Sequence, residues 1–444
     1  MAYFKRALLN ELKSWAKSQK QKPIILQGAR QVGKTTLLKE LGESEFKNYA
    51  YFNFDENPEL KQFFIETKNI DRILSNLSLA IGHQITEETL IIFDEIQECK
   101  EALNSLKYFA ENAPNYKIAA AGSLLGITIG NHSSFPVGKV KFFTLYPLSF
   151  SEFLYCSNPN LHQYLQTFDF NSIIPDIFFN QLTDILRKYF ICGGLPEAAH
   201  VMIESNSTDL VKSVLNDVLR AYELDFSKHV VSKDIQKISY IWNSLPTQLA
   251  RENKKFLYQT VKEGARAREY EDALTWLIQA GLVYKTQKIS KVGVPISAYD
   301  ELSAFKLYAF DVGVLRQLAK LEPSVFLDGN SLFTEFKGAL SENFILQGLI
   351  SILDTTPRYW TSEGRAEVDF VIQYKNKILP IEVKSDKNIK NKSLSFFAVN
   401  NGTPIKIRYS LRNLKIEDDL VNIPLFLVDY TKRILDPILD LKKG

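Results

Sequence analysis

The chain has 444 residues, of which 45% are hydrophobic and 24% are charged, and its formal net charge at pH 7 is +3. This composition excludes a disordered chain, the length predicts about three domains, and the charge is too small to indicate a nucleic-acid partner by itself. No apolar run approaches the roughly 20 residues that cross a bilayer, so no membrane partner is expected. Three cysteines without C-x-x-C spacing, Cys99, Cys156 and Cys192, favour reduced thiols and therefore a cytoplasmic location.

Residues 1–150 alternate short apolar runs with segments of helical periodicity. The runs PIILQGA, YAYFNFD, TLIIFDE and YKIAAAGS are predicted as strands, and GKTTLLKEL and DRILSNLSLAIGHQI as helices. Such alternation predicts an α/β domain in which helices cover both faces of a mostly parallel sheet.

The first predicted strand leads into GARQVGKTT, which fits the pattern G-x-x-x-x-G-K-[ST] at Gly28, Gly33, Lys34 and Thr35. Glycines let the backbone curl so that its N–H groups face phosphate oxygens. Lys34 would reach the β- and γ-phosphates of ATP, and the Thr35 hydroxyl would hold Mg²⁺. A glycine-rich turn without a ligand is the alternative. The predicted ATP-binding loop consists of Gly28, Ala29, Arg30, Gln31, Val32, Gly33, Lys34, Thr35 and Thr36.

Two acidic residues end the apolar run of TLIIFDEIQ. The carboxyl end of a central parallel strand is where such sheets bind ligands. Asp94 would bind Mg²⁺ through water, and Glu95 would polarise the water that attacks the γ-phosphate. Capping of the next helix is the alternative role for Asp94. Ser123, at the end of the next strand, is predicted to sense the γ-phosphate or, alternatively, to be a turn residue.

The segments GARQVGKTTLL, LIIFDEIQ, AAAGSLLG, LYPLSFSEFL and YFICGGLPEA resemble a large family of bacterial and archaeal AAA-type ATPases that carry a C-terminal region of uncharacterised function. The resemblance covers nearly the whole chain and implies a P-loop ATPase with a catalytic Glu beside the metal-binding Asp, which Asp94 and Glu95 match. Where the family commonly has Gly-Arg before PLSF, this chain has Lys139, which lacks the planar fork of arginine. Arg187 and Arg220 are other candidates for an arginine finger.

The middle of the chain is predicted to contain two further parts. Residues 151–233 are mainly helical and are interpreted as a lid or linker. Residues 234–330 combine a helix-turn-helix with strands and resemble a winged helix. Arg266 and Arg268 could contact a DNA backbone, but the acidic residues of the helix expected to read DNA would repel phosphates, so packing or an oligomer contact is the alternative.

Two alternating strands flank YKNK in AEVDFVIQYKNKILPIEVKSDK. If residues 375–376 form a two-residue turn, Asp369 lies directly opposite Glu382, with Cβ atoms about 4.5–5.5 Å apart. One more turn residue would place Asp369 opposite Val383 instead. Two carboxylates so close repel each other unless a cation lies between them. The solvated polar face of an ordinary hairpin is the alternative explanation.

The D…E-x-K arrangement resembles the PD-(D/E)XK core of restriction-endonuclease-like nucleases, although Val368 stands where the Pro of the motif would be. The resemblance implies that residues 331–444 form an α/β domain of that fold. It also implies that Asp369 and Glu382 hold Mg²⁺, that Lys384 orients the attacking water, and that Glu342 on the preceding helix is an auxiliary ligand.

Two hypotheses about function follow from these patterns. In the first, hydrolysis of ATP with Mg²⁺ drives DNA binding and metal-dependent cleavage by the C-terminal domain. In the second, the ATPase is a nucleotide-controlled interaction protein whose nuclease-like domain is an inert binding module. The candidate partners are ATP, DNA, another copy of the chain and a different protein.

Overall fold

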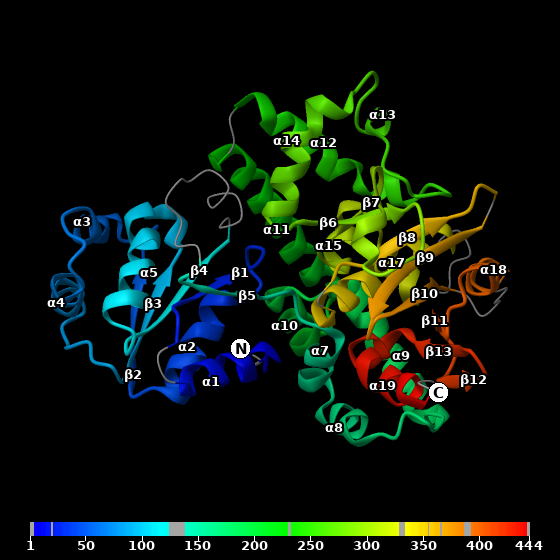
Figure 1. The fold of residues 1–444 in the computed structure, drawn as a ribbon, viewed down its shortest axis with the longest axis horizontal. Coiled ribbons are helices and arrows are strands. Elements are labelled where there is room, and N and C mark those ends of the chain that lie inside the picture. The colour runs from blue at the N-terminus through cyan, green and yellow to red at the C-terminus, as the bar shows by residue number, and fades with distance from the viewer. Residues whose placement is uncertain are drawn as a thin grey trace. The chain divides into compact units, whose positions relative to one another are not determined.

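The computed structural model describes residues 4–18, 21–123, 138–229, 232–327, 334–353, 355–364, 366–385 and 392–441 (Figure 1). The chain divides into two compact units. The smaller unit contains Lys5–Tyr146 and Gln279–Gly281, and the other described residues form the larger unit.

The smaller unit is built on a sheet of five parallel strands in the order β2-β3-β4-β1-β5. This confirms the predicted N-terminal parallel sheet, with β5 as an addition. The strands are β1 (Ile24–Gln27), β2 (Asn48–Asn53), β3 (Thr89–Asp94), β4 (Lys117–Gly122) and β5 (Lys141–Thr144). The helices are α1 (Leu8–Lys17), α2 (Lys34–Glu45), α3 (Gln62–Ile65), α4 (Ile70–Ile81) and α5 (Lys100–Asn112).

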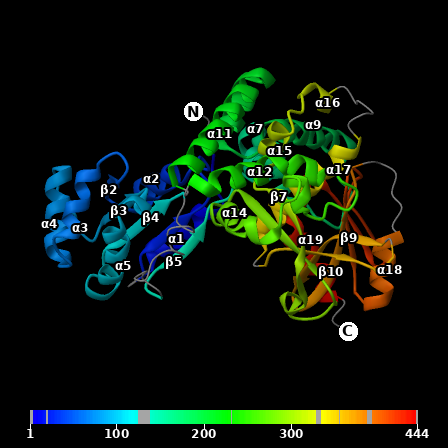
Figure 2. The same cartoon turned by 90° about the horizontal axis from the view of Figure 1, so that it is seen from above.

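Alternate side chains of these strands pack against helices on the two faces of the sheet. Phe52 and Phe93 belong to the core that α3, α4 and α5 complete with apolar residues such as Phe64, Leu77 and Phe109. The helices α3, α4 and α5 lie together on one side in Figures 1 and 2. Helix α2 packs against β2, β3 and β4, and α1 packs against α2. Because helices cover both faces of the sheet, β3 and β4 are buried along their length.

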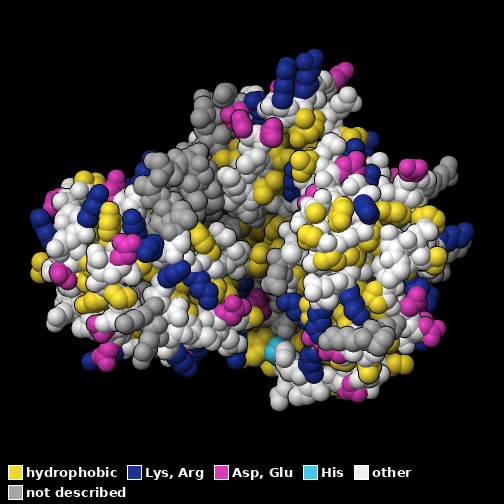
Figure 3. Space-filling model, viewed as in Figure 1, with side chains coloured by type: hydrophobic (Ala, Val, Ile, Leu, Met, Phe, Trp, Pro, Cys, Tyr) yellow, Lys and Arg dark blue, Asp and Glu magenta, His cyan; other side chains and the backbone are white. Residues whose placement is uncertain are grey.

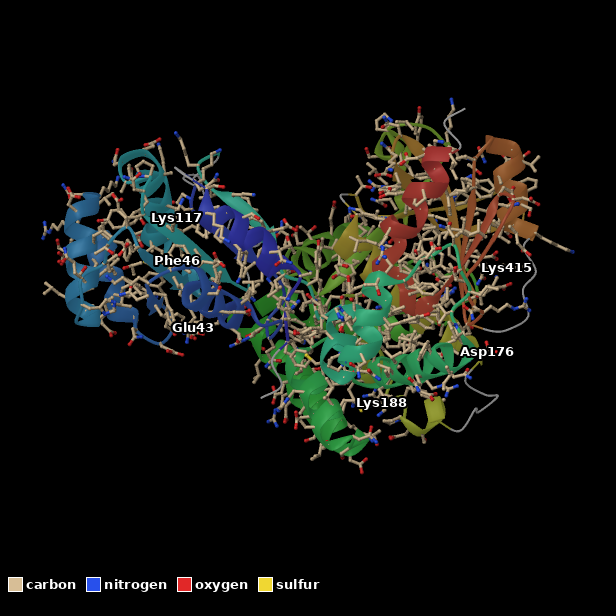
Figure 4. The ribbon with its side chains drawn as sticks, turned by 90° about the horizontal axis from the view of Figure 1, so that it is seen from below. Glu43, Phe46, Lys117, Asp176, Lys188 and Lys415 are labelled. Carbon is tan, nitrogen blue, oxygen red and sulfur yellow. The ribbon has the colours of Figure 1, made fainter. Side chains whose placement is uncertain are left out.

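The amino ends of the strands lie away from the predicted phosphate loop. Figure 4 labels Lys117, the first residue of β4, together with Glu43 and Phe46 near the end of α2. Lys117 is buried, and its Nζ donates a hydrogen bond to the carbonyl oxygen of Ser18 at 2.5 Å. This contact ties the end of α1 to the sheet, so we assign Lys117 to stability rather than chemistry.

The first half of the larger unit is mainly helical, as predicted for residues 151–233. They pack around buried aromatic residues such as Tyr189, which contacts Phe150, Phe153 and Phe344. The helices before the sheet are α7 (Phe150–Ser157), α8 (Pro159–Thr167), α9 (Asp176–Cys192), α10 (Pro196–Ser205), α11 (Thr208–His229), α12 (Ser232–Leu249), α13 (Tyr258–Val261) and α14 (Ala267–Gln279). The later ones are α15 (Val312–Leu318), α16 (Ser324–Leu327), α17 (Thr334–Ile352), α18 (Lys392–Asn401) and α19 (Thr431–Leu441).

An eight-stranded mixed sheet runs through the larger unit in the order β12-β13-β11-β10-β9-β8-β6-β7. Its strands are β6 (Val283–Ile289), β7 (Asp300–Ala309), β8 (Arg358–Thr361), β9 (Glu367–Tyr374), β10 (Lys377–Val383), β11 (Lys406–Ser410), β12 (Lys415–Glu417) and β13 (Leu420–Pro424). Apart from Gln279–Gly281, the described residues of the ranges 151–233, 234–330 and 331–444 all fall within this one unit, and β6 pairs with β8 at Lys288 and Tyr359. The boundary at residue 330 lies outside the described residues, and the three ranges remain predictions.

The described surface is mixed in charge. On the face shown in Figure 3, Lys and Arg side chains are interspersed with Asp and Glu over both units. None of the helices in the described ranges is long and apolar enough to cross a membrane.

A buried carboxylate joins two parts of the larger unit. Asp311 caps α15 by accepting the N–H of Val314 at 3.0 Å, and its other oxygen accepts the N–H of Gly194 at 2.7 Å. Gly194 belongs to the Gly-Gly turn after α9, where a Cβ on Gly193 would lie 2.1 Å from Asp311 Oδ1. The Gly-Gly turn is therefore required for this contact.

Replacing Asp311 by Ala is expected to destabilise the larger unit by about 3 kcal/mol. The reason is that two buried N–H groups lose a carboxylate acceptor, each bond being worth about 1.5–3 kcal/mol. Denaturant unfolding followed by circular dichroism measures the change. Asp176→Ala is the matched control, because Asp176 is exposed in the first turn of α9 and should change the free energy of unfolding by less than about 0.5 kcal/mol. Equal effects of the two substitutions would contradict the assignment.

Candidate functional sites

The phosphate loop, residues 28–36, connects the carboxyl end of β1 to the first turn of α2. Gly28 has φ 152°, and an added Cβ there would lie 2.2 Å from the carbonyl oxygen of Leu145. Gly33 has φ 96° and directly precedes α2. Since glycine alone adopts such a backbone without strain, the shape of the loop explains both glycines of the pattern.

The Lys34 side chain is buried and folds back over the loop. Its Nζ donates to the carbonyl oxygens of Gly28 at 3.0 Å and Ala29 at 2.8 Å, and to the Ser123 hydroxyl at 3.1 Å. Burial lowers the pKa of Lys34 to about 8, while two nearby carboxylates oppose the shift. Phosphate oxygens would be stronger acceptors for this ammonium group than the neutral oxygens it contacts.

Thr35 and Asp94 meet at the carboxyl ends of β1 and β3. Thr35 Oγ1 donates to Asp94 Oδ2 at 2.6 Å, and Asp94 is 3% exposed. The N-cap residues of η2 (Ile96–Glu98) and α5, which follow β3, are Glu95 and Cys99, and neither makes a side-chain cap. A hydroxyl and a carboxylate in contact are the oxygen ligands that Mg²⁺ takes beside bound phosphates, so these residues fit the ion.

Glu95 follows Asp94 directly and has a left-handed backbone with φ 47°. Its side chain accepts a hydrogen bond from Gln97 Nε2. Its own N–H donates to Asp94 Oδ1 at 3.1 Å. The left-handed turn thus places a second carboxylate beside the first at the end of the strand.

Two residues of this site carry no motif and were missed by the sequence patterns. Tyr51 in β2 donates its hydroxyl to Asp94 Oδ2 at 2.9 Å. Arg6 is 6% exposed, and its guanidinium donates to the carbonyl oxygens of Val32 at 2.8 Å and Tyr146 at 2.6 Å. Both residues make these contacts with residues that are distant in the sequence. A Tyr in an alternating strand and an Arg near an amphipathic helix give no signal of such contacts.

The three basic residues considered for an arginine-type role remain predictions. Lys139 pairs with Glu111 at 3.0 Å in the smaller unit. Arg187 is an exposed partner of Asp184 at 2.7 Å, and Arg220 is exposed on α11. Both arginines belong to the larger unit.

The second site begins at the hairpin of β9 and β10. Its turn consists of residues 375–376, whose φ values of 47° and 58° are left-handed, so the turn has the shorter of the two lengths considered above. The antiparallel register ends with Ile381 opposite Phe370. Asp369 and Glu382 come one position beyond the last pair of this register, so it stays a prediction that they face each other.

Two of the acidic residues of this site are enclosed. Glu382 is 6% exposed and Glu342, on α17, is 3% exposed. Asp369 Oδ2 accepts the N–H of Val383 at 2.8 Å. Glu342 and Glu382 therefore do not lie on an open, solvated face, whereas Asp369 is partly exposed.

Lysines from separate segments accompany these carboxylates. Lys306 has no exposed side-chain surface, and Lys254 and Lys384 are 17% and 33% exposed. The Tyr308 hydroxyl also donates to Glu342 Oε2 at 3.0 Å. The ion pairs are Lys254 with Glu342, Lys306 with Glu367, and Lys384 with Glu382, the last at 2.6 Å.

The charges shift the proton affinities of two acids in opposite directions. Burial and the charge of Glu342 raise the pKa of Asp369 above its ordinary value, against the effect of the nearby lysines. Burial works against ionisation of Glu342 too, but the ammonium groups of Lys254 and Lys306 outweigh it and lower its pKa. Glu342 is thus held as a carboxylate, whereas the positive charge around Asp369 is too small to offset the rise in its pKa.

A divalent ion beside Asp369 would supply the positive charge that the lysines do not. In the described ranges no three His, Cys, Asp or Glu side chains are arranged together to hold a metal ion. Two carboxylates remain suitable: Asp369, and Glu382, whose buried Oε2 has no hydrogen-bond partner among the described residues. Mg²⁺ is bound in proteins by one or two carboxylates with water and substrate phosphates, so this pair fits it.

Comparison with known proteins supports the first site. Residues 20–154 match a family model described as an AAA domain, so the phosphate loop belongs to an AAA-type P-loop ATPase domain. Residues 183–325 and 337–426 match models described as domains of unknown function, DUF8612 and DUF4143. No curated protein matches the chain.

Solved structures show weaker likenesses. A Walker-type ATPase of Pyrococcus abyssi is 15% identical, with 71% of this chain and 96% of that chain covered and a TM-score of 0.46. Cdc6p from Pyrobaculum aerophilum is 10% identical, with 74% and 97% covered and a TM-score of 0.26. Thermotoga maritima RuvB is 15% identical, with 63% and 88% covered and a TM-score of 0.26. These similarities are too low to support a conclusion about function.

Proposed function

We propose that the smaller unit binds ATP with Mg²⁺ at the phosphate loop and hydrolyses it to ADP and phosphate. The observation that carries the proposal is the contact of Thr35 with Asp94 next to the buried Lys34. Two separate segments, the first turn of α2 and the end of β3, bring a cation, a hydroxyl and a carboxylate to one place. This is the arrangement that phosphoryl transfer needs, because its catalysis consists mainly of positioning and charge stabilisation.

Each residue has a defined task in this proposal. The loop N–H groups and Lys34 bind the phosphates, and Ser123 lies beside Lys34 Nζ, where it would sense the γ-phosphate. Thr35 and Asp94 would hold Mg²⁺, which supplies positive charge between the β- and γ-phosphates. Glu95 accepts a proton from the attacking water as the bond to the γ-phosphorus forms and ADP leaves. The remaining loop residues, Ala29, Arg30, Gln31, Val32 and Thr36, surround the phosphates.

Titration of the protein with a fluorescent ATP analogue in the presence of Mg²⁺ tests the nucleotide site. Replacing Lys34 by Ala should raise the dissociation constant at least about tenfold, because a charge-assisted bond to phosphate is lost. Lys47→Ala is the control, since Lys47 is 77% exposed in the same unit and pairs with Glu88 at the surface. Absence of nucleotide binding in the wild type, or unchanged binding in the Lys34 variant, would overturn the proposal.

We further propose that the larger unit cleaves phosphodiester bonds of DNA in a metal-dependent reaction. The supporting observation is the buried Glu382, one oxygen of which lacks a partner among the described residues, next to Asp369, whose Oδ2 accepts the N–H of the adjacent Val383. The pair would hold Mg²⁺, which supplies positive charge for the phosphate and lowers the pKa of bound water. Lys384, beside Glu382, would orient the attacking water. The exposed Arg266 and Arg268 of the winged-helix-like part would contact the DNA backbone.

The second candidate function is a nucleotide-controlled interaction protein, in which the larger unit binds a protein or a second copy of the chain without cleaving DNA. The charges in Figure 3 favour it, because the described Lys and Arg side chains in view are interspersed with Asp and Glu, which would repel the phosphates of DNA. In either case we propose a cytoplasmic location, because no disulfide joins Cys99, Cys156 and Cys192.

A further inference from the structure

Lys254 lies beside the candidate metal-binding residues, although it comes from a distant segment of the chain. It lies in the loop between α12 and α13, 88 residues before Glu342 in the chain. Its ammonium group forms an ion pair with Glu342 Oε1, and only 17% of its side chain is exposed. Asp369 and Glu367 also act on it electrostatically. Lys254 is therefore part of the acidic cluster around the hairpin.

The backbone at Lys254 is in a conformation that lysine rarely adopts. Its φ is 48°, in the left-handed region, which is strained for a residue with a Cβ. The following N–H, of Lys255, bonds to the Asn253 side chain at 3.3 Å. One residue further, the Phe256 N–H donates to the carbonyl oxygen of Phe305 in β7 at 2.9 Å, and the two rings stack. The loop is thus fastened on both sides of Lys254, and its ion pair offsets the strain.

Both oxygens of Glu342 are already engaged within the protein. Lys254 takes Oε1, and the Tyr308 hydroxyl takes Oε2. Glu382 differs from it, because Lys384 binds Oε1 while Oε2 has no partner among the described residues. A divalent ion at Glu342 would compete with a lysine ammonium on one oxygen and a tyrosine hydroxyl on the other, whereas Oε2 of Glu382 has no such competitor among the described residues.

We propose that Lys254 is the built-in cation of this site. It holds Glu342 away from metal coordination, so that a single divalent ion is bound by the carboxylates of Asp369 and Glu382. The ammonium supplies the positive charge that a second divalent ion would otherwise bring. The inference rests on the proposed metal binding of the larger unit, and it replaces the expectation that Glu342 is an auxiliary ligand. Lys254 is a positioning residue, because it acts through Glu342.

Calorimetric titration of nucleotide-free protein with Mn²⁺ tests this inference. Binding that Glu382→Gln removes is assigned to the site. Lys254→Met should bind Mn²⁺ at least about tenfold more tightly than the wild type, because an opposing charge is gone and Glu342 is released. The double variant Lys254→Met/Glu342→Gln should return to within about threefold of the wild type. Lys255→Met, which removes the neighbouring lysine, should leave the affinity unchanged.

The single variant leaves a buried carboxylate without its ion pair and is expected to be destabilised. If it folds only when Mn²⁺ is present, that dependence supports the inference in the same way as tighter binding. If it does not fold at all, the double variant decides. Affinity close to the wild type supports the inference, and a loss of tenfold or more would show that Glu342 is a ligand.

Unchanged affinity of a folded Lys254→Met variant, or absence of Mn²⁺ binding in every variant, would overturn the inference. DNA cleavage is a separate measurement on the same proteins. Tighter Mn²⁺ binding without cleavage in any variant would uphold the role of Lys254 and contradict only the proposed nuclease reaction.

Discussion

Replacing Glu95 by Gln is expected to leave ATP binding nearly unchanged and to slow hydrolysis at least about a hundredfold. The phosphates are bound by the loop and Lys34, which the substitution does not touch. The amide keeps the size of the side chain but cannot accept the proton of the attacking water, and such proton transfer typically contributes about 10²- to 10⁴-fold. Phosphate release under single-turnover conditions, together with nucleotide titration, separates the two effects.

Glu98→Gln is the matched control for this experiment. Glu98 lies three residues further along, in the short helix η2 that follows β3. It has no role in the proposed reaction, so its loss should change the rate by less than about twofold. A Glu95 variant that hydrolyses ATP as fast as the Glu98 variant would show that another group activates the water.

The smaller unit was predictable because its signals are local. The apolar runs around residues 24–27 and 89–94 are buried on both sides, as central parallel strands are, and the glycines at 28 and 33 permit a backbone that few other residues adopt. The strand order β2-β3-β4-β1-β5 was not predictable, because it depends on which surfaces pack together. The same limit hid Tyr51, whose hydroxyl reaches Asp94 only because β2 lies next to β3.

The hairpin of the larger unit was predictable down to its register, because a two-residue turn fixes which residues are opposite. Its surroundings were not. Lys254 and Tyr308 lie 88 and 34 residues before their partner Glu342, and Lys306 lies 61 residues before its partner Glu367. No periodicity relates the three residues to Asp369. Their ion pairs and hydrogen bonds arise when β7 joins the same sheet as β9 and when the loop after α12 folds against Glu342. Long-range pairing of this kind leaves no trace in a single sequence.

Replacing Glu382 by Gln is expected to reduce metal-dependent cleavage of plasmid DNA at least about a hundredfold. The amide removes the charge of one of the two proposed carboxylate ligands, so the ion that activates water would be bound weakly. Lys384→Ala should also lose cleavage, since it removes the group proposed to orient the water, but it should keep Mn²⁺ binding. Gel analysis of supercoiled plasmid with Mg²⁺, in parallel with calorimetry, measures both properties.

The matched control is Lys415→Ala, which removes an exposed lysine of β12 in the same sheet (Figure 4). The Lys34→Ala variant tests whether nucleotide binding in the smaller unit affects cleavage by the larger unit. Loss of cleavage in that variant would mean that nucleotide binding controls the second site, whereas full cleavage would mean that the two reactions are independent. If the wild type turns over ATP but leaves the plasmid intact, the larger unit is a binding module, because two carboxylates with one lysine can hold an ion without presenting it to DNA.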